Sequence, residues 1–103
     1  MAQFDIYRNK GKGREHYPYF MVLQHDLFDE LNTRIVVPLT PKANLLPTSG
    51  IHPGVNISGK NFTILTDLMT SIDSKRLDTE PVATASHLHS EIVNALDLLI
   101  TGI

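Results

Sequence analysis

Polar and apolar residues alternate at the start of the chain. Phe4 and Ile6 fall on one face, and Gln3, Asp5 and Tyr7 fall on the other. This period of two predicts a half-buried β-strand. The next seven residues contain two glycines and four positive charges, which is typical of a mobile hairpin connection.

Two apolar runs predict the next strands. Residues 17–24 are almost continuously aromatic and aliphatic, with Pro18 near the start, where a missing amide hydrogen is tolerated. Residues 34–39 include three consecutive β-branched side chains, a pattern typical of a strand covered on both faces. We therefore place this segment at the centre of the sheet and expect Pro38 to mark its end.

The middle of the chain predicts a loop and then further strands. Four Pro and Gly residues interrupt residues 40–53, which favours an irregular connection. Residues 55–57 and 62–66 flank a four-residue connection that contains Gly, so they predict a β-hairpin. Residues 69–77 alternate in a way that suits one more strand.

The last segment changes period. Residues 85–100 contain neither Gly nor Pro, and an apolar stripe with helical spacing runs through Leu88, Ile92, Ala95, Leu96 and Leu99. Gly102 is expected to cap the C-terminus of this helix, and Thr84 or Ser86 to cap its N-terminus.

Some apolar residues have no evident partner in this scheme. Val93, Leu98 and Ile100 lie outside the helical stripe. Leu27, Phe28 and Leu31 occur in a polar, turn-prone segment. Two interpretations remain open for the helix end: a loop covers it, or it forms, together with Leu27 and Phe28, a surface for another protein or a second copy of the chain.

Composition narrows the class of protein. The 103 residues, 11.5 kDa in mass, suit one domain spanning residues 1–103. The net charge of −2 does not suit a protein that binds a phosphate backbone with its whole surface. There is no cysteine, no signal-peptide pattern at the start and no apolar run long enough to cross a bilayer, so we expect a cytoplasmic protein without membrane contact.

No motif for catalysis or for a metal stands out. The five histidines are scattered, and His87 with Glu91 would supply only half of a metal site. No nucleophile elbow occurs, and the glycines at 11 and 13 lack the spacing of a phosphate-binding loop. We therefore expect no catalytic residues, no metal and no cofactor, and the residues favour a binding protein over an enzyme.

With its segments placed, the chain resembles the CcdB toxin family over its whole length. The resemblance rests on the order of several short motifs: Gln3-Phe4-X-Ile6-Tyr7, Val22-X-Gln24-X-Asp26-Leu27, Arg34-Ile35-Val36-Val37-Pro38-Leu39, Thr66-X-X-Met69, Asn94-Ala95-Leu96-X-Leu98 and Gly102-Ile103.

The resemblance implies a mainly β fold with a C-terminal helix: a single SH3-like β-barrel domain of the type shared by CcdB and MazF. It further implies a homodimeric toxin of a type II toxin–antitoxin system. Such a toxin performs no chemistry; it binds the A subunit of DNA gyrase and traps the complex of gyrase with cleaved DNA. A CcdA-like antitoxin would neutralise it by folding on binding, and the two would repress their own operon, with operator DNA contacted only through the antitoxin complex.

The resemblance also implies a gyrase-binding surface. Its positions in this sequence are Leu27, Phe28, Asp97, Ile100, Thr101, Gly102 and Ile103. Asp97 and Thr101 stand where the family pattern has Asn and Trp. Because Trp is a frequent hot spot at interfaces, worth about 2 kcal/mol or more, Thr101 predicts weaker gyrase binding or an anchor elsewhere.

Three alternatives remain open. Leu27, Phe28, Ile100 and Ile103 would all be buried if they packed within a dimer. A MazF-like endoribonuclease would require an acid–base pair around an RNA phosphate, for which Arg34 with Thr66 or His25 are the candidates. A degenerate toxin would retain only the binding of antitoxin.

Overall fold

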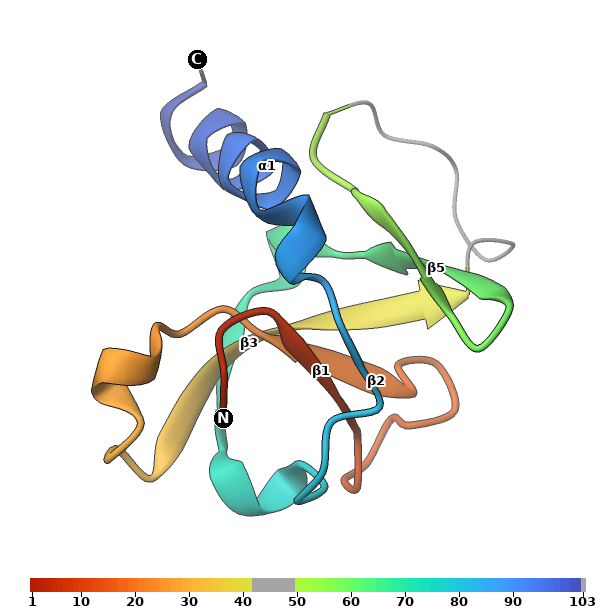
Figure 1. Cartoon of the computed structure of the whole chain (residues 1–103), viewed down its shortest axis with the longest axis vertical. Helices are drawn as coiled ribbons and strands as arrows, with labels where there is room; N and C mark the ends of the chain where they lie inside the picture. Colours follow the sequence, from red (N-terminus) through yellow and green to blue (C-terminus); the bar gives the residue numbers. More distant parts are fainter. Residues whose placement is uncertain (42–49, 103) are drawn as a thin grey trace.

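The central strand of the molecule is β3 (Thr33–Pro41), and the rest of the sheet is built around it (Figure 1). The computed structural model describes residues 1–41 and 50–102. Its other strands are β1 (Asp5–Arg8), β2 (Tyr19–Val22), β4 (Gly54–Ile57), β5 (Lys60–Ile64), β6 (Thr70–Asp73) and β7 (Ala83–Thr84). Short 3-10 turns, η1 (Asp26–Phe28), η3 (Thr66–Leu68), η4 (Ser74–Arg76) and η5 (Ser86–Leu88), and one helix, α1 (His89–Thr101), complete the fold.

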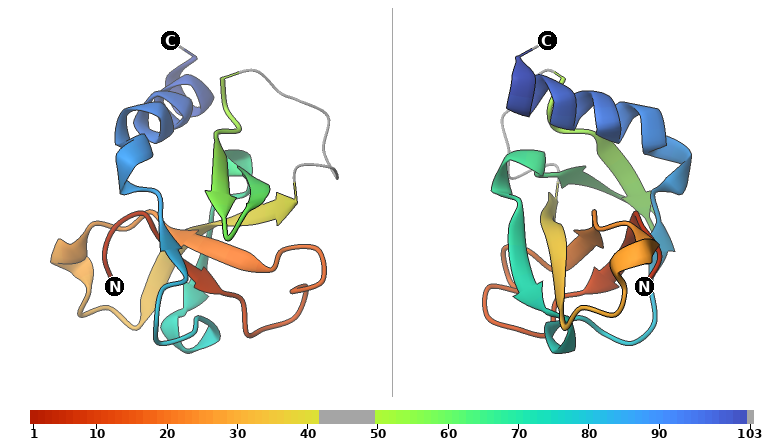
Figure 2. Two further views of the ribbon diagram at one scale, coloured as in Figure 1. Left: turned by 45° about the vertical axis from the view of Figure 1, so that its right-hand side comes forward. Right: turned by 90° about the vertical axis from the view of Figure 1, so that its left-hand side faces the viewer.

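The seven-stranded sheet has the order β4-β5-β3-β2-β1-β7, and β6 also pairs with β3. All of its pairings are antiparallel. The first half of β3 pairs with β6 and its last residues pair with β5, so the sheet curls into a nearly closed barrel with α1 at one end (Figure 2). The predicted mainly β barrel with a C-terminal helix is confirmed.

The prediction that residues 34–39 form the central strand is confirmed, but the prediction that Pro38 ends it is wrong. Pro38 lies opposite Phe20 on β2, and its carbonyl accepts a hydrogen bond from the Leu65 amide at 3.0 Å. Proline lacks a donor but keeps its acceptor. The strand therefore continues past Pro38 to Pro41.

Both faces of β1, β2 and β3 are buried, against two separate groups of apolar side chains. One group includes Ile6, Met21 and Val37, and it continues under β4, β5 and α1. The other includes Tyr7 and Val36. The expectation that Tyr7 lies on a polar face is therefore wrong, because the curled sheet encloses a second apolar cluster on that side.

The predicted hairpin is present, with a shorter connection than expected. Ile57 pairs directly with Lys60, so only Ser58 and Gly59 form the turn. Both have positive φ, 52° and 87°, which is the backbone of a type I′ turn and matches the twist of the flanking strands.

The C-terminal helix begins later than predicted and ends where predicted. Ala85 is fully buried, and its amide donates to the carbonyl of Phe4 at 2.8 Å, so it belongs to the barrel rather than to α1. The Thr84 hydroxyl accepts the Ser86 amide at 3.2 Å, but neither η5 nor α1 has a side-chain cap at its N-terminus, so the predicted cap by Thr84 or Ser86 is wrong. Gly102 adopts φ 75° and donates to the carbonyl of Leu98 at 3.0 Å, which confirms the predicted left-handed C-cap.

The remaining predictions hold in part. The strand predicted at 69–77 is shorter, because β6 gives way to η4 at Ser74. The loop predicted at 40–53 lies mostly outside the described residues. Within residues 1–41 and 50–102, no helix is long and apolar enough to cross a membrane.

Candidate protein-binding surfaces

Leu27 and Phe28, which we call the η1 patch, project from a single 3-10 turn. Leu27 is 76% exposed and Phe28 is 52% exposed. The turn forms because the His25 side chain accepts the Leu27 amide through Nδ1 at 3.0 Å, while the Asp29 amide donates to the Asp26 carbonyl at 3.1 Å. Local polar contacts thus hold two large apolar side chains in water.

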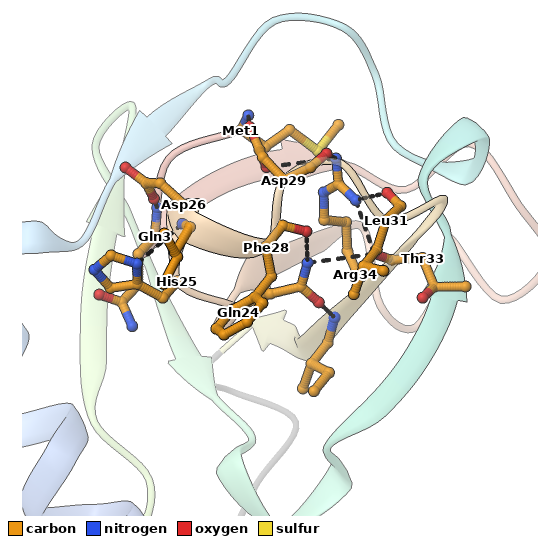
Figure 3. Close-up of polar contacts among 12 residues, drawn as sticks. Met1, Gln3, Gln24, His25, Asp26, Phe28, Asp29, Leu31, Thr33 and Arg34 are labelled. Carbon is orange, nitrogen blue, oxygen red and sulfur yellow. Dashed lines mark hydrogen bonds and ion pairs between the residues drawn. The ribbon is translucent and has the colours of Figure 1, made fainter.

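A network of hydrogen bonds fixes this turn on the barrel (Figure 3). The Gln24 side chain donates to the Phe28 carbonyl at 2.9 Å and accepts the Ile35 amide at 3.3 Å, which connects the turn to β3. On the other side, Asp26 Oδ1 accepts the Gln3 amide at 2.6 Å. The η1 patch is therefore presented on an ordered scaffold, which lowers the entropy cost of binding a partner.

Arg34 organises the segment after η1. Its buried guanidinium donates to the carbonyls of Asp29 at 2.7 Å, Thr33 at 2.8 Å and Leu31. It also lies 3.4 Å from Asp29 Oδ1, and the amino group of Met1 lies 2.5 Å from Asp29 Oδ2 (Figure 3). Arg34 thus acts as a structural brace that satisfies turn carbonyls.

The structure does not support the acid–base set predicted for an endoribonuclease. Arg34 is occupied by the turn carbonyls, and His25 caps η1. Thr66 is fully buried, and its hydroxyl donates to the Ile51 carbonyl. Each group therefore has a structural partner, and no hydrogen bond joins any two of the three in the described part of the chain.

The second surface, the helix-end patch, consists of residues 97–102 on the last turn of α1. Ile100 is 72% exposed, and Leu98 and Leu99 are each 39% exposed. The Asp97 carboxylate lies in an exposed position, where its charge stays hydrated. Thr101 donates its hydroxyl to the Asp97 carbonyl at 2.6 Å, so this side chain is turned back onto the helix. Ile103, the last predicted contact, lies outside the described residues.

The two patches are not adjacent within one protomer. In three views of the molecule, η1 and the C-terminal end of α1 lie well apart along its long axis (Figures 1 and 2). The interpretation that Leu27 and Phe28 form one continuous surface with the helix end is therefore wrong for a single copy. Sequence spacing gave no signal for this separation, because it depends on how the whole barrel closes.

The structure also brings together polar groups that sequence patterns did not connect. His52 Nε2 lies 2.7 Å from Asp67 Oδ1, and both residues line an open pocket with His16 and Tyr17. Their separation of 15 residues along the chain matches no motif. The predicted half-site of His87 and Glu91 gains no third ligand: no group of three His, Asp or Glu side chains suited to a metal occurs among residues 1–41 and 50–102.

Burial perturbs one titratable group. The pKa of Tyr7 is raised, first because its hydroxyl is desolvated in the second apolar cluster and then because the carboxylates of Asp5, Asp29 and Glu80 are nearby. Tyr7 therefore serves as a neutral core residue at physiological pH.

Comparison with known proteins connects this fold to toxins. A solved structure described as an endoribonuclease in complex with its cognate antitoxin, from a mycobacterial species, superimposes with a TM-score of 0.77. The alignment covers 98% of this chain and 95% of the other at 12% identity, a likeness of fold alone. The family model for the CcdB protein matches residues 3–102. The chain therefore belongs to the CcdB family of toxin–antitoxin toxins.

Proposed function

We propose that this protein poisons DNA gyrase by binding the A subunit of the enzyme and holding gyrase on cleaved DNA. The observation that carries the proposal is the exposure of large apolar side chains at positions matching the family's gyrase contacts. Leu27, Phe28 and Ile100 are 76%, 52% and 72% exposed. Anchors of this kind, on an ordered scaffold, suit a binding surface with a hydrophobic centre. The toxin itself would form or break no covalent bond and would need no cofactor.

Asp97 and Thr101, which depart from the family pattern, change which side chains would contribute affinity for gyrase. Thr101 is turned back onto α1 by its bond to the Asp97 carbonyl, so it supplies little apolar area to a partner. Ile100 and Phe28 would then serve as the main anchors, one on each patch. Gly102, with its left-handed backbone and no side chain, would allow close approach at the helix end.

We further propose that the protein acts as a homodimer. Leu68 and Met69, at the end of η3, are exposed apolar residues on the element against which α1 packs. Leu98 and Leu99 on α1 are also exposed. Burial of these four side chains in a dimer interface would add stability to a domain of this small size. Light scattering tests this proposal: a dimer has about twice the 11.5 kDa mass of the chain.

The proposed regulator is a CcdA-like antitoxin whose disordered segment folds on the toxin in the cytoplasm. The structural neighbour, an endoribonuclease, is itself in complex with its antitoxin, which supports the idea that this fold accommodates such a partner. The net charge of −2 favours operator contact through the antitoxin rather than through the toxin.

Calorimetry with the isolated A subunit of gyrase tests the binding step. We expect saturable binding by the full chain and weaker binding when Ile100 is replaced by Asp, because a charge would enter an apolar contact. Antitoxin binding should remain in the same variant. Binding of antitoxin by the parent chain, with no binding to gyrase at any concentration, would instead identify a degenerate toxin.

A further inference from the structure

Six of the nine Lys and Arg residues of the chain lie in two short segments, residues 8–14 and 74–76. Neither segment contains an acidic residue, so the rest of the chain carries three basic and all eleven acidic side chains. The net charge of −2 therefore conceals a local excess of positive charge. We call the six residues, all of them exposed, the basic end: Arg8, Lys10, Lys12, Arg14, Lys75 and Arg76.

Backbone hydrogen bonds bring the two segments together. The Lys10 amide donates to the Arg76 carbonyl at 2.9 Å, and the Asp78 amide donates to the Arg8 carbonyl at 3.3 Å. A Cβ atom on Gly11 would lie 2.7 Å from Arg76 Nε, so the guanidinium rests directly against the loop. The fold thus gathers positive charges that are far apart in the sequence.

Buried Asn9 fixes the base of the loop between β1 and β2. Its side chain is covered, since the residue is only 5% exposed. Asn9 Nδ2 donates to the Tyr17 carbonyl at 3.0 Å, and Asn9 Oδ1 accepts the Gly11 amide at 2.8 Å. The backbone at the start of the loop is therefore ordered, which lowers the entropy cost of binding a partner with the side chains that it carries.

The charges of the basic end are not neutralised within the chain. Among residues 1–41 and 50–102, none of the six side chains forms an ion pair with a carboxylate. The two acidic residues that flank η4 bind backbone amides: Asp73 accepts the Lys75 amide at 2.9 Å, and Asp78 accepts the Thr79 amide at 2.9 Å. Because like charges repel, an anionic partner would stabilise this arrangement.

The chemistry of the basic end fits the phosphate backbone of duplex DNA better than it fits a peptide or a single strand. Residues 8–14 and 74–76 contain no apolar or aromatic side chain. A disordered segment that folds on binding needs apolar burial to offset its ordering entropy, and single strands bind by stacking their bases on aromatic rings. Long Lys and Arg side chains suit the regular phosphates of a duplex.

The basic end lies at the end of the barrel opposite α1 (Figures 1 and 2). The molecule measures 33 Å along its longest axis, and the helix-end patch lies at the other end of that axis. A toxin that contacts the A subunit of gyrase through α1 would therefore leave the basic end available to DNA that the same enzyme holds.

We propose that the basic end binds the phosphate backbone of duplex DNA without sequence preference, and that this contact strengthens binding of the toxin to gyrase on DNA. The gain on gyrase rests on the proposed function, whereas the DNA contact itself does not. Binding of the A subunit would make the DNA contact intramolecular, so the two contacts together raise the affinity. The basic end contacts phosphates rather than base edges, so it is separate from the operator contact proposed for the antitoxin.

Fluorescence anisotropy of a labelled DNA duplex with the full chain tests the DNA contact without gyrase. Each phosphate contact contributes about −0.9 to the slope of the log association constant against log salt, so six contacts predict a slope of about −5. The triple variant Lys10→Gln, Lys12→Gln, Arg14→Gln should show a slope of about −3 and at least about 10-fold weaker binding at about 50 mM salt. Urea unfolding confirms that the variant is folded.

Lys12→Gln and Lys60→Gln form a matched pair of single substitutions. Both lysines are exposed, but Lys60 lies at the start of β5, outside the basic end. Lys12→Gln should reduce the magnitude of the slope by about 1, and Lys60→Gln should leave it unchanged. Equal slopes in the parent and the triple variant, or no duplex binding by the parent at low salt, would overturn the proposal.

A second titration compares the isolated A subunit with gyrase bound to DNA. We expect the Kd of the parent for gyrase on DNA to be lower by about 10-fold or more than its Kd for the A subunit. The triple variant should keep the Kd for the A subunit and lose this gain; an equal gain in both proteins would overturn the link to gyrase. If the parent does not bind the A subunit, the proposed function fails, while the duplex titration still decides whether the basic end binds DNA.

Discussion

Replacing Phe28 with Ala is the sharpest test of the η1 patch. A phenylalanine side chain buries about 150–250 Å² when fully covered, and 52% of Phe28 is exposed. Roughly 100 Å² therefore remains for a partner to cover, which at about 25 cal/mol per Å² contributes about 2.5 kcal/mol. Alanine keeps the Cβ atom, so the loss is about 2 kcal/mol, or about 30-fold in the Kd for the A subunit of gyrase.

Folding stability should change little in the same variant. Half of the Phe28 side chain is already in water, and the backbone contacts that hold η1 use its carbonyl rather than its ring. We expect the free energy of unfolding to fall by no more than about 1 kcal/mol. Calorimetric titration with the A subunit of gyrase and urea unfolding measure the two quantities on the same preparation.

Leu31→Ala is the matched control. Leu31 is 54% exposed, a fraction similar to the 52% of Phe28. It lies outside the proposed gyrase contacts. Its replacement should leave the Kd within about 2-fold. An unchanged Kd in Phe28→Ala, or an equal loss in Leu31→Ala, would refute the argument that the η1 patch is a specific anchor.

Three further predictions address the helix end, the core and the second apolar cluster. Deletion of Gly102 and Ile103 should abolish gyrase poisoning while the urea midpoint stays nearly constant, because a helix terminus adds little to a core; a truncated chain that still poisons gyrase would exclude this site. Val37→Asp should unfold the domain, because Val37 is fully buried and an unpaired charge there costs about 4–5 kcal/mol or more; a cooperative unfolding transition in this variant would contradict the role of β3. Because burial raises the pKa of Tyr7, its contribution to stability is complete below about pH 10 and is lost as pH rises through the raised value. Between about pH 8 and about pH 10.5, the free energy of unfolding measured with urea should therefore fall less in Tyr7→Phe than in the parent. An equal fall in both proteins would contradict the view that ionisation of the buried Tyr7 hydroxyl causes the loss.

Local patterns predicted the elements that local interactions form. The run of β-branched residues identified β3, and the absence of Gly and Pro up to Gly102 identified α1. The errors occur where tertiary contacts decide. Ala85 continues the helical pattern, yet its bond to Phe4 holds it in the barrel, and Tyr7 is buried because curling of the sheet encloses both faces.

The candidate sites show the same limit. Leu27 and Phe28 stood out as apolar residues in a polar turn, which is a local signal, but the sequence left open whether they are exposed or buried in a dimer. The separation of η1 from the helix end, and the meeting of His52 with Asp67, depend on the path of the closed barrel. Pairings of this kind leave no periodic trace in a single sequence.

A DNA cleavage assay tests the central claim most directly. Purified gyrase, ATP and supercoiled plasmid are incubated with and without the protein, and linear DNA is measured after treatment with detergent and protease. The account predicts that linear DNA accumulates with increasing protein and that the Gly102–Ile103 deletion prevents it. Unchanged gyrase activity across a wide range of concentrations of the folded protein would contradict the account.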